Sequence, residues 1–552
     1  MLPSAITAAV PDRTTIPAPE RSALSRFAAP LEAEERDPVL PRFQPDTGGP
    51  AGLPGSTGRY PVRDIRVTGA RVLDPAEIES VVGEYRGRAL SFQEMIALRD
   101  RITARYVDAG YVTSGAVLES LDDGVLHIDV VEGALERIEV HSAGQLRPQF
   151  VADYLSGFGT TTPVNVLDLE ERLQILQQDP HVSVIEAQLL PGPNRGESVL
   201  LVSPGETERW GLTVEASNQL SPAIGAAQGV ASLSFLNLTG RTDDLSFSTR
   251  AAEGLLELMG EYDFPLGARG ARMSVYAFGA DSDIVRGPFH DLDIGADTFT
   301  GGTRLRWPVR RTLTTRMNLL LAAEWRESKT FLLGQGFSFI EGPEDGKAVM
   351  TILRGGLDYL YRNQRDVIYA RVEASAGVDA LGATVSSDAD VPDGRFAKLW
   401  GQFQWARRLP WLDSQLLLRL DGQVSNDPLF GIEQYPVGGR WTVRGYRENT
   451  LIRDNAVVAS VEWRWPLFRS PGGRSLFEVR PFADWSRSAN VDGDEIGPAT
   501  LASVGVGAYW SPLESLEMEV YWGDALNEVT YAGDYDLQDD GIHFRLTWGA
   551  LP

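Results

Sequence analysis

An alternation of apolar and polar residues, sustained from Trp210 almost to the carboxyl terminus, is the feature that most constrains the fold of this chain. Successive side chains of a β-strand point to opposite faces, so this alternation predicts strands with one apolar and one polar face. The alternating segments have roughly the ten-residue length of strands that cross a bilayer. We therefore predict about sixteen such strands between Arg209 and Gly549.

Three carboxyl-terminal segments, residues 456–467, 475–486 and 542–548, show the pattern most clearly. One face of each is apolar with aromatic ends and the other is largely polar or charged, as a lipid-facing exterior and a watery lumen require. The apolar faces carry Val461, Trp485 and Trp548, and the opposite faces carry Glu462, Phe482, Asp484 and His543.

The connections between these segments differ in length in a regular way. Short turns such as TGRTD, PLGAR, RNQR and SPLE alternate with longer segments, which are residues 282–295, 328–347, 380–394, 427–454 and 525–539. Outer-membrane barrels have short periplasmic turns and long outer loops, and barrel closure pairs every strand edge. A soluble sandwich or propeller, the alternative, would not require this alternation of loop lengths. The longest apolar run, Met317–Ala323, is too short for a transmembrane helix.

Residues 61–205 differ from the rest because helical periodicity appears between predicted strands. The order strand, helix, helix, strand, strand occurs in residues 61–133 and again in residues 134–205, which predicts two copies of one α/β module. The helical stripes that we expect to face the cores are Phe92, Ile96, Leu98, Ile102 and Tyr106 in the first copy, and Leu167, Leu169, Leu173 and Leu176 in the second. The fold class is therefore α+β followed by all-β, with residues 206–552 forming the barrel.

Residues 1–60 have a different composition, rich in proline, alanine and glycine. Residues 38–58 are predicted to be a linker, and residues 20–36 a short helix that Pro30 would kink or end. The first residues, MLPSAITAAV, lack the basic region of a signal peptide, which suggests a truncated or processed start.

Composition excludes several classes of function. The formal net charge of −25 argues against a nucleic-acid partner, because phosphate binding needs a basic face. The chain contains no cysteine, so disulfides and thiolate sites are absent.

No motif supports catalysis, a cofactor or a metal site. GPEDGKA, residues 342–348, is one residue too short for a phosphate-binding loop and ends in alanine. The five histidines lack metal-ligand spacing, and His543 is predicted to line a pore. DYDLQDDG, residues 534–541, could attract calcium but lacks the terminal glutamate of a calcium-binding hand, so we expect a solvated acidic loop.

The predicted loop 427–454 contains GGRWTVRGYREN, in which an arginine lies among glycines. Gly438, Gly439 and Gly445 permit a tight backbone course with positive φ. An arginine folded into a confined lumen needs a carboxylate, and Asp484 and Phe482 are predicted to face that lumen. From the residues alone, an exposed loop with a solvated arginine remains the alternative.

These segments together resemble the two-partner-secretion transporters (TpsB proteins, ShlB/FhaC/HecB-like) of the POTRA–β-barrel superfamily. VLHIDVVEGALERIEV and LDLEERLQILQQDPHVSVIEAQLLPG resemble parts of the two POTRA modules, and VRGY resembles the sixth-loop motif of the superfamily. FADWS matches the second barrel motif except that Ser486 replaces the usual glycine. The resemblance implies that the loop folds into a sixteen-stranded barrel and that its arginine pairs with the aspartate, so the implied residues are Val443, Arg444, Gly445, Tyr446, Phe482 and Asp484.

The resemblance also implies a function. The barrel would lie in the outer membrane as a monomer surrounded by lipid, with the POTRA modules in the periplasm. It would export, and in some relatives activate, a large β-helical exoprotein (TpsA-like) such as a haemolysin. Residues 20–36 would plug the resting pore, as the amino-terminal helix does in family members, with a disordered tail as the alternative. The missing nucleotide motif predicts export without nucleotide hydrolysis. The alternatives are a factor that assembles other barrels or adhesins, and a passive porin; the first usually has more POTRA modules and the second needs none.

Overall fold

The structure, a computed structural model, describes residues 58–142, 144–157, 163–267, 269–388, 390–491 and 497–550. The predicted helix at residues 20–36 and the predicted linker up to residue 57 lie outside the described residues. Two compact units are present: the barrel, and the two α/β modules that precede it in the sequence. No helix in the described ranges combines the length and apolar character needed to cross a membrane.

The first module contains a three-stranded sheet in which β5 is central. Its strands pair in the order β2-β5-β4, with β2 parallel and β4 antiparallel to β5, while β1 pairs with β3. Helix α3 begins at a capping box in which Ser91 and Glu94 each accept a hydrogen bond from the other's backbone N–H. The elements are β1(Arg59–Val62), β2(Asp64–Thr68), α2(Pro75–Val82), β3(Arg88–Ser91), α3(Phe92–Asp108), β4(Gly115–Asp122) and β5(Val125–Val131).

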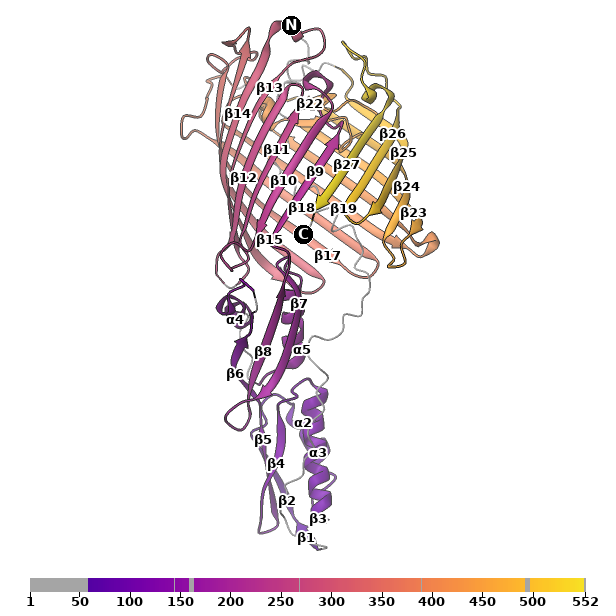
Figure 1. The fold of residues 1–552 in the computed structure, drawn as a ribbon. Helices are drawn as coiled ribbons and strands as arrows, with labels where there is room; N and C mark the ends of the chain where they lie inside the picture. Colours follow the sequence, from indigo (N-terminus) through magenta and orange to yellow (C-terminus); the bar gives the residue numbers. More distant parts are fainter. Residues whose placement is uncertain are drawn as a thin grey trace. The chain divides into compact units, whose positions relative to one another are not determined.

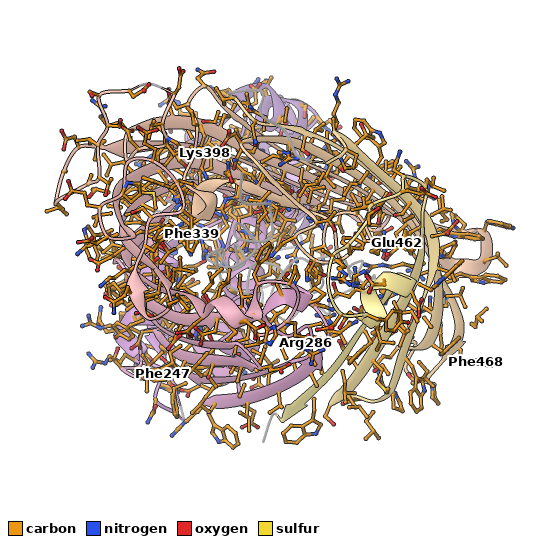
Figure 2. All side chains as sticks on the ribbon, turned by 90° about the horizontal axis from the view of Figure 1, so that it is seen from above. Phe247, Arg286, Phe339, Lys398, Glu462 and Phe468 are labelled. Atoms are coloured by element: carbon orange, nitrogen blue, oxygen red, sulfur yellow. The ribbon has the colours of Figure 1, made fainter. Side chains whose placement is uncertain are left out.

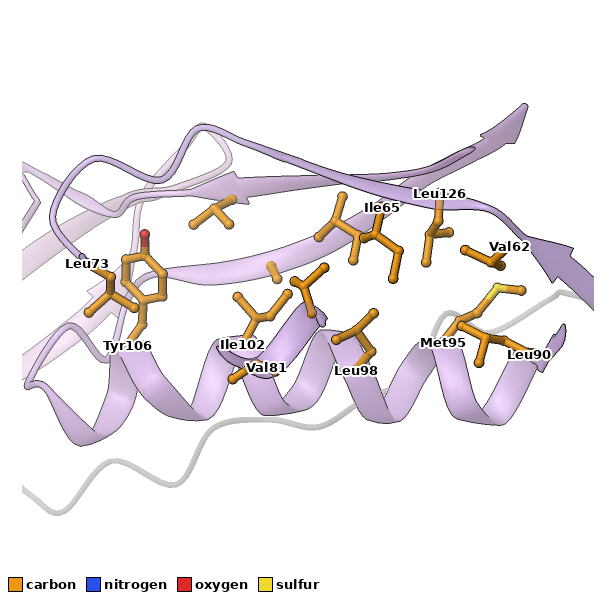
Figure 3. Close-up of a cluster of buried hydrophobic side chains, with 14 residues drawn as sticks. Val62, Ile65, Leu73, Val81, Leu90, Met95, Leu98, Ile102, Tyr106 and Leu126 are labelled. Carbon is orange, nitrogen blue, oxygen red and sulfur yellow. The ribbon is translucent and has the colours of Figure 1, made fainter. Parts of the chain in front are cut away.

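The core of this module lies between α3 and the sheet (Figure 3). Met95, Leu98, Ile102 and Tyr106 are the buried residues of α3. The predicted stripe was therefore partly wrong: Phe92 and Ile96 are only partly buried, and Met95 occupies the inner position. Met95 is three residues before Leu98, a spacing that places both side chains on one helix face.

The second module repeats the three-stranded sheet of the first, with β8 as its central strand, but its described residues have no counterparts of β1 and β3. β8 pairs in parallel with β6 and antiparallel with β7. Leu169, Leu173 and Leu176 of α5 are buried as predicted, but Leu167 is 65% exposed. Residues two apart on a helix face different directions, so Leu167 cannot share the inner face with Leu169. The elements are β6(Ala134–Val140), α4(Pro148–Gly157), α5(Val166–Gln177), β7(Val182–Pro191) and β8(Glu197–Glu206).

The barrel is closed by antiparallel pairing of its last strand, β27, with its first, β9 (Figure 1). Its described residues form sixteen long strands, as predicted from the alternation, and the two-residue β16(Gln335–Gly336) extends the edge of β15. The strands are β9(Trp210–Ser217), β10(Gln228–Leu236), β11(Asp244–Ala252), β12(Leu255–Pro265), β13(Arg272–Asp283), β14(Ile294–Arg311), β15(Thr315–Leu332), β17(Lys347–Arg362), β18(Asp366–Val378), β19(Phe396–Leu409), β20(Ser414–Ser425), β23(Asn455–Arg469), β24(Ser475–Ala489), β25(Thr500–Leu513), β26(Leu516–Ala525) and β27(Ile542–Ala550).

Side chains alternate between the two faces of the barrel wall. The outward residues Trp485 and Trp548 are 42% and 43% exposed, whereas the inward residues Glu462 and Asp484 are 4% and 3% exposed. The inward residues are polar yet buried, so part of the chain must fill the lumen beside them.

Loop lengths follow the predicted alternation with one exception. β11 and β12 are joined by only Glu253 and Gly254, a two-residue hairpin turn at the end of the barrel where the other connections are longer. The connection between β20 and β23 is the sixth at that end and spans residues 426–454.

Candidate functional site

The sixth loop, residues 426–454, folds back into the lumen as a hairpin of its own. Its strands β21(Tyr435–Val437) and β22(Leu451–Arg453) pair antiparallel, and VRGY lies in the segment between them. Val443, Arg444 and Tyr446 are 0%, 4% and 1% exposed. Val443 and Tyr446 pack in one apolar cluster with Val458 of β23 and Leu501 of β25, so the motif lies against the inner wall.

The structure brings Arg444 and Asp484 together. Arg444 Nε and Nη2 donate to the two carboxylate oxygens of Asp484, each at 2.8 Å, and the Arg444 backbone N–H donates to the same carboxylate at 3.0 Å. The guanidinium carbon lies 3.6 Å from the centre of the Phe482 ring. Both lumen residues that the sequence singled out therefore contact the arginine, one by charge and one by its aromatic face.

Two further partners were not identified from the sequence. Arg444 Nη1 donates to Glu462 at 2.5 Å, and Ser460 Oγ accepts from Arg444 at 3.0 Å while donating to Asp484 at 2.6 Å. Glu462 was recognised as a lumen residue, but its distance from VRGY could not be read from the chain. Ser486, the departure from the family motif, is fully buried and donates to the Leu501 carbonyl at 3.4 Å.

Glycines allow the backbone of the loop to lie in direct contact with the backbone of the barrel wall. Gly445 has φ +90°, and Gly438 and Gly439 have φ +103° and +96°, which glycine adopts with little strain. A Cβ atom on Gly523 of β26 would lie 2.8 Å from the Gly445 backbone nitrogen. The contact between Gly445 and Gly523 thus requires that neither residue has a side chain.

Two groups of ion pairs, here called anchors, hold the loop to the barrel wall. In the first, described above, the loop contributes the cation Arg444; in the second, which was not identified from the sequence, the loop contributes an anion. Glu433, in a short 3-10 turn (η5, Gly431–Glu433), is 2% exposed. Its carboxylate accepts from Arg326 at 2.6 Å and Arg354 at 3.0 Å, and pairs with Lys398. These cations come from β15, β17 and β19, whereas the partners of Arg444 come from β23 and β24.

Figure 2 shows Lys398 and Glu462 in separate parts of the barrel. One arm of the loop therefore inserts an anion into a cationic pocket, and its tip inserts a cation into an acidic pocket.

A third contact joins the sixth loop to residues 526–541, the loop between β26 and β27. Arg447 donates to the two Asp539 oxygens at 2.5 and 2.7 Å. The prediction that DYDLQDDG is a solvated acidic loop was therefore wrong for Asp539, because this carboxylate holds Arg447. Gln538 is fully buried and accepts from the Glu448 backbone at 2.8 Å. His543 lies inward as predicted, but this loop arrangement leaves it 0% exposed.

Comparison with known proteins assigns the fold to a family. Residues 196–509 match the model of the haemolysin secretion/activation protein ShlB/FhaC/HecB family, and residues 60–133 match the ShlB-type POTRA domain. The chain belongs to the ShlB/FhaC/HecB family.

Characterised relatives of this ShlB-family chain include transporters from several bacteria. It is 26% identical to the outer membrane transporter CdiB of Escherichia coli over 492 residues, which cover 83% of this chain and 78% of that protein. It is 22% identical to the haemolysin transporter ShlB of Serratia marcescens, with 75% and 73% coverage. The CdiB structure from E. coli has a similar fold, with a TM-score of 0.67 at 20% identity and 100% and 99% coverage.

In this ShlB-family barrel an internal cavity adjoins the sixth loop. The cavity has a volume of about 240 Å³ and is lined by Arg326, Arg354, Lys398 and Glu433 at one anchor and by Arg444 and Glu462 at the other. The arrangement places ion pairs inside the barrel beside the inserted loop. Among the described residues no group of three or more His, Asp or Glu side chains is arranged to hold a metal ion.

Proposed function

We propose that this outer-membrane transporter exports a large secreted partner protein through its barrel, and that Arg444 is a latch that holds the sixth loop inside the lumen in the conformation that export requires. The inward fold of the loop, with Arg444 bound to Asp484 and Glu462, is the observation that carries the latch. Family membership supports the export function, because the relatives are two-partner-secretion transporters. The barrel lies in the outer membrane and the POTRA modules in the periplasm.

The cargo would first bind the POTRA modules as an extended chain. β6 and β7 are the outer strands of the second module's sheet, and an extended segment adds to a strand edge through main-chain hydrogen bonds. Residues 134–203 are therefore our first choice for the contact, with a TpsA-like exoprotein as the partner. The transporter would act as a monomer surrounded by outer-membrane lipid, and residues 20–36 remain a predicted plug.

Export would proceed without enzymatic chemistry. Residues 342–348 run from the loop after β15 directly into strand β17. A phosphate-binding loop instead precedes a helix, whose N-terminus receives the phosphate. We therefore propose that folding of the cargo outside the cell, rather than nucleotide hydrolysis, makes export directional.

The deciding experiment compares proteins in the medium of three strains: one with the intact chain, one lacking it, and one with Arg444→Ala. A dedicated transporter predicts that one large protein disappears from the medium of the second strain and is strongly reduced in the third. The abundance of other outer-membrane barrels should stay unchanged. Unchanged secretion together with depletion of other barrels would instead establish an assembly factor.

A further inference from the structure

An aromatic and cationic patch lies on the outer surface of the barrel where two adjacent short turns meet. The turn after β19, residues 410–413, and the end of β23 contribute to it. Trp411 and Phe468 are 65% and 64% exposed, and Leu412 and Leu467 are each 42% exposed. Figure 2 shows Phe468 projecting from the outside of the wall.

Three stacked indole rings lie in and beside this patch. Trp411 stacks on Trp463 with ring centres 5.4 Å apart and planes 9° apart, and Trp463 stacks on Trp465 at 5.7 Å and 5°. These rings lie at the end of the barrel that carries the short turns, which is the periplasmic end in outer-membrane barrels. Tryptophan is favoured at the level of lipid headgroups, where one part of the ring is in an apolar layer and the other is near water.

The backbone of the turn is strained in a way that exposes apolar side chains. Leu412 and Asp413 have φ +59° and +46°, in the left-handed region that side chains other than Asn, Asp and Gly rarely adopt. Arg408 and Arg469 hold this conformation by donating to Asp413 at 2.8 and 3.1 Å. In this conformation Trp411 lies against Trp463 on the outside of the wall, and both Trp411 and Leu412 keep a large exposed surface.

Cations lie at this turn and beside it: Arg408 and Arg469 bind Asp413, and Arg407 lies over the Trp405 ring at 5.7 Å. Arg407, Arg408 and Arg469 have side chains that are 45%, 42% and 35% exposed. The carboxylates that face them are Asp413 and Asp366; the latter is 3.8 Å from Arg407, too far for a hydrogen bond. Three guanidinium groups therefore meet two carboxylates and the Gly473 carbonyl, which accepts from Arg469 at 2.8 Å. Each guanidinium has five N–H donors, so donors remain for an anion beyond those used by Asp413 and Gly473.

We propose that this patch, formed by Arg407, Arg408, Trp411, Leu412, Phe468 and Arg469, binds an anionic phospholipid of the inner leaflet of the outer membrane. The guanidinium groups contact the headgroup phosphate, and Trp411, Leu412 and Phe468 insert beside the acyl chains. Both parts are needed, because the cations supply charge complementarity and the exposed rings supply apolar contact at the same depth. The binding surface is separate from the lumen and from the export path, so it holds whether or not the proposed latch is correct.

The absence of cysteine from the chain permits a direct test. Leu467→Cys places a single fluorescent label beside the patch in the full-length protein, reconstituted in phosphatidylcholine vesicles. Spin-labelled phosphatidylglycerol or spin-labelled phosphatidylcholine is then added as a quencher. We expect the phosphatidylglycerol probe to associate about fivefold more strongly at low salt, the effect of roughly one arginine at a membrane surface. The preference should disappear in 1 M NaCl, because salt screens exposed charges.

Controls separate the patch from general properties of the barrel. A label at Leu266→Cys reports on another short turn at the same end, where the native leucine is 41% exposed; it should show little preference. Replacing Arg407, Arg408 and Arg469 by glutamine should remove the preference at position 467, whereas Arg269→Gln on the other turn should leave it unchanged. Equal quenching of the native patch by both lipids at low salt would overturn the proposal. Quenching of the 467 label by aqueous iodide but by neither lipid would also overturn it and indicate a protein-binding surface.

Discussion

Arg444 and Asp484 form a bidentate ion pair across 40 residues of sequence, and the Arg444 backbone N–H adds a third hydrogen bond to the same carboxylate. The loop tip is therefore fixed in orientation as well as in position, because the side chain and the main chain of one residue bind one partner. Lysine could not reproduce this geometry, since its single ammonium group lacks the planar pair of donors.

Arg444→Ala should destabilise the closed position of the loop by about 3–5 kcal/mol, the usual effect of removing one partner of a buried pair. We expect export to fall sharply while the barrel remains in the outer membrane, measured as cargo in the medium against membrane-embedded protein. Arg444→Lys should be nearly as defective. Arg395→Ala is a matched control, because Arg395 pairs with Asp393 on another outer loop and its side chain is 53% exposed. We expect this variant to export normally. Normal export by Arg444→Ala would contradict the latch. Combining Arg444→Ala with Asp484→Ala should cost less than the sum of the single changes.

The sequence was sufficient for features that depend on local pattern and motif. Alternation predicted the barrel strands and placed Asp484 inside, and the VRGY resemblance directed attention to Arg444. The sequence was insufficient where the path of a loop decides which residues meet. No residue near Glu433 in the sequence indicates that Arg326, Arg354 and Lys398 will surround it. Helix rotation was similarly uncertain, because several apolar positions of α3 fit a helical period and only packing selects Met95 over Phe92.

Gly523→Ala should disrupt the latch without changing any charge. The added methyl group would lie 2.8 Å from the Gly445 nitrogen and 3.0 Å from the Arg444 carbonyl carbon, so the loop backbone would have to move. We expect export to decrease and the conductance of the reconstituted barrel to increase. Gly279→Ala is the control, because a Cβ at this strand position meets no atom within 4 Å. Equal behaviour of the two alanine variants would show that close backbone contact is not needed.

Glu433→Gln should loosen the arm of the loop that leads to the tip. The substitution removes the carboxylate that Arg326, Arg354 and Lys398 share. Arg326 and Arg354 keep Glu324, at 3.0 and 2.9 Å, but losing one negative charge among three buried cations is unfavourable. Hydrogen exchange measured by mass spectrometry should increase in residues 429–437 more than in residues 443–446, which keep their own anchor. Glu341→Gln, at an exposed position of another outer loop, should change neither segment. An increase limited to residues 443–446 would show that the two anchors are not independent.

The contact between Arg447 and Asp539 should weaken in acid. Burial opposes the charged form of Asp539, but hydrogen bonds from Arg447 and from the Asp536 backbone outweigh it and hold the pKa of this carboxyl below its usual value. A lowered pKa in the folded state means that the contact contributes fully above about pH 4, the ordinary aspartate value, and is lost as the pH falls through the lowered value. A spin label on the loop of residues 526–541 should therefore become more mobile below that pH in the native protein. Asp539→Asn should be mobile at neutral pH with little further change in acid; a native-like transition in this variant would assign the pH response to another group.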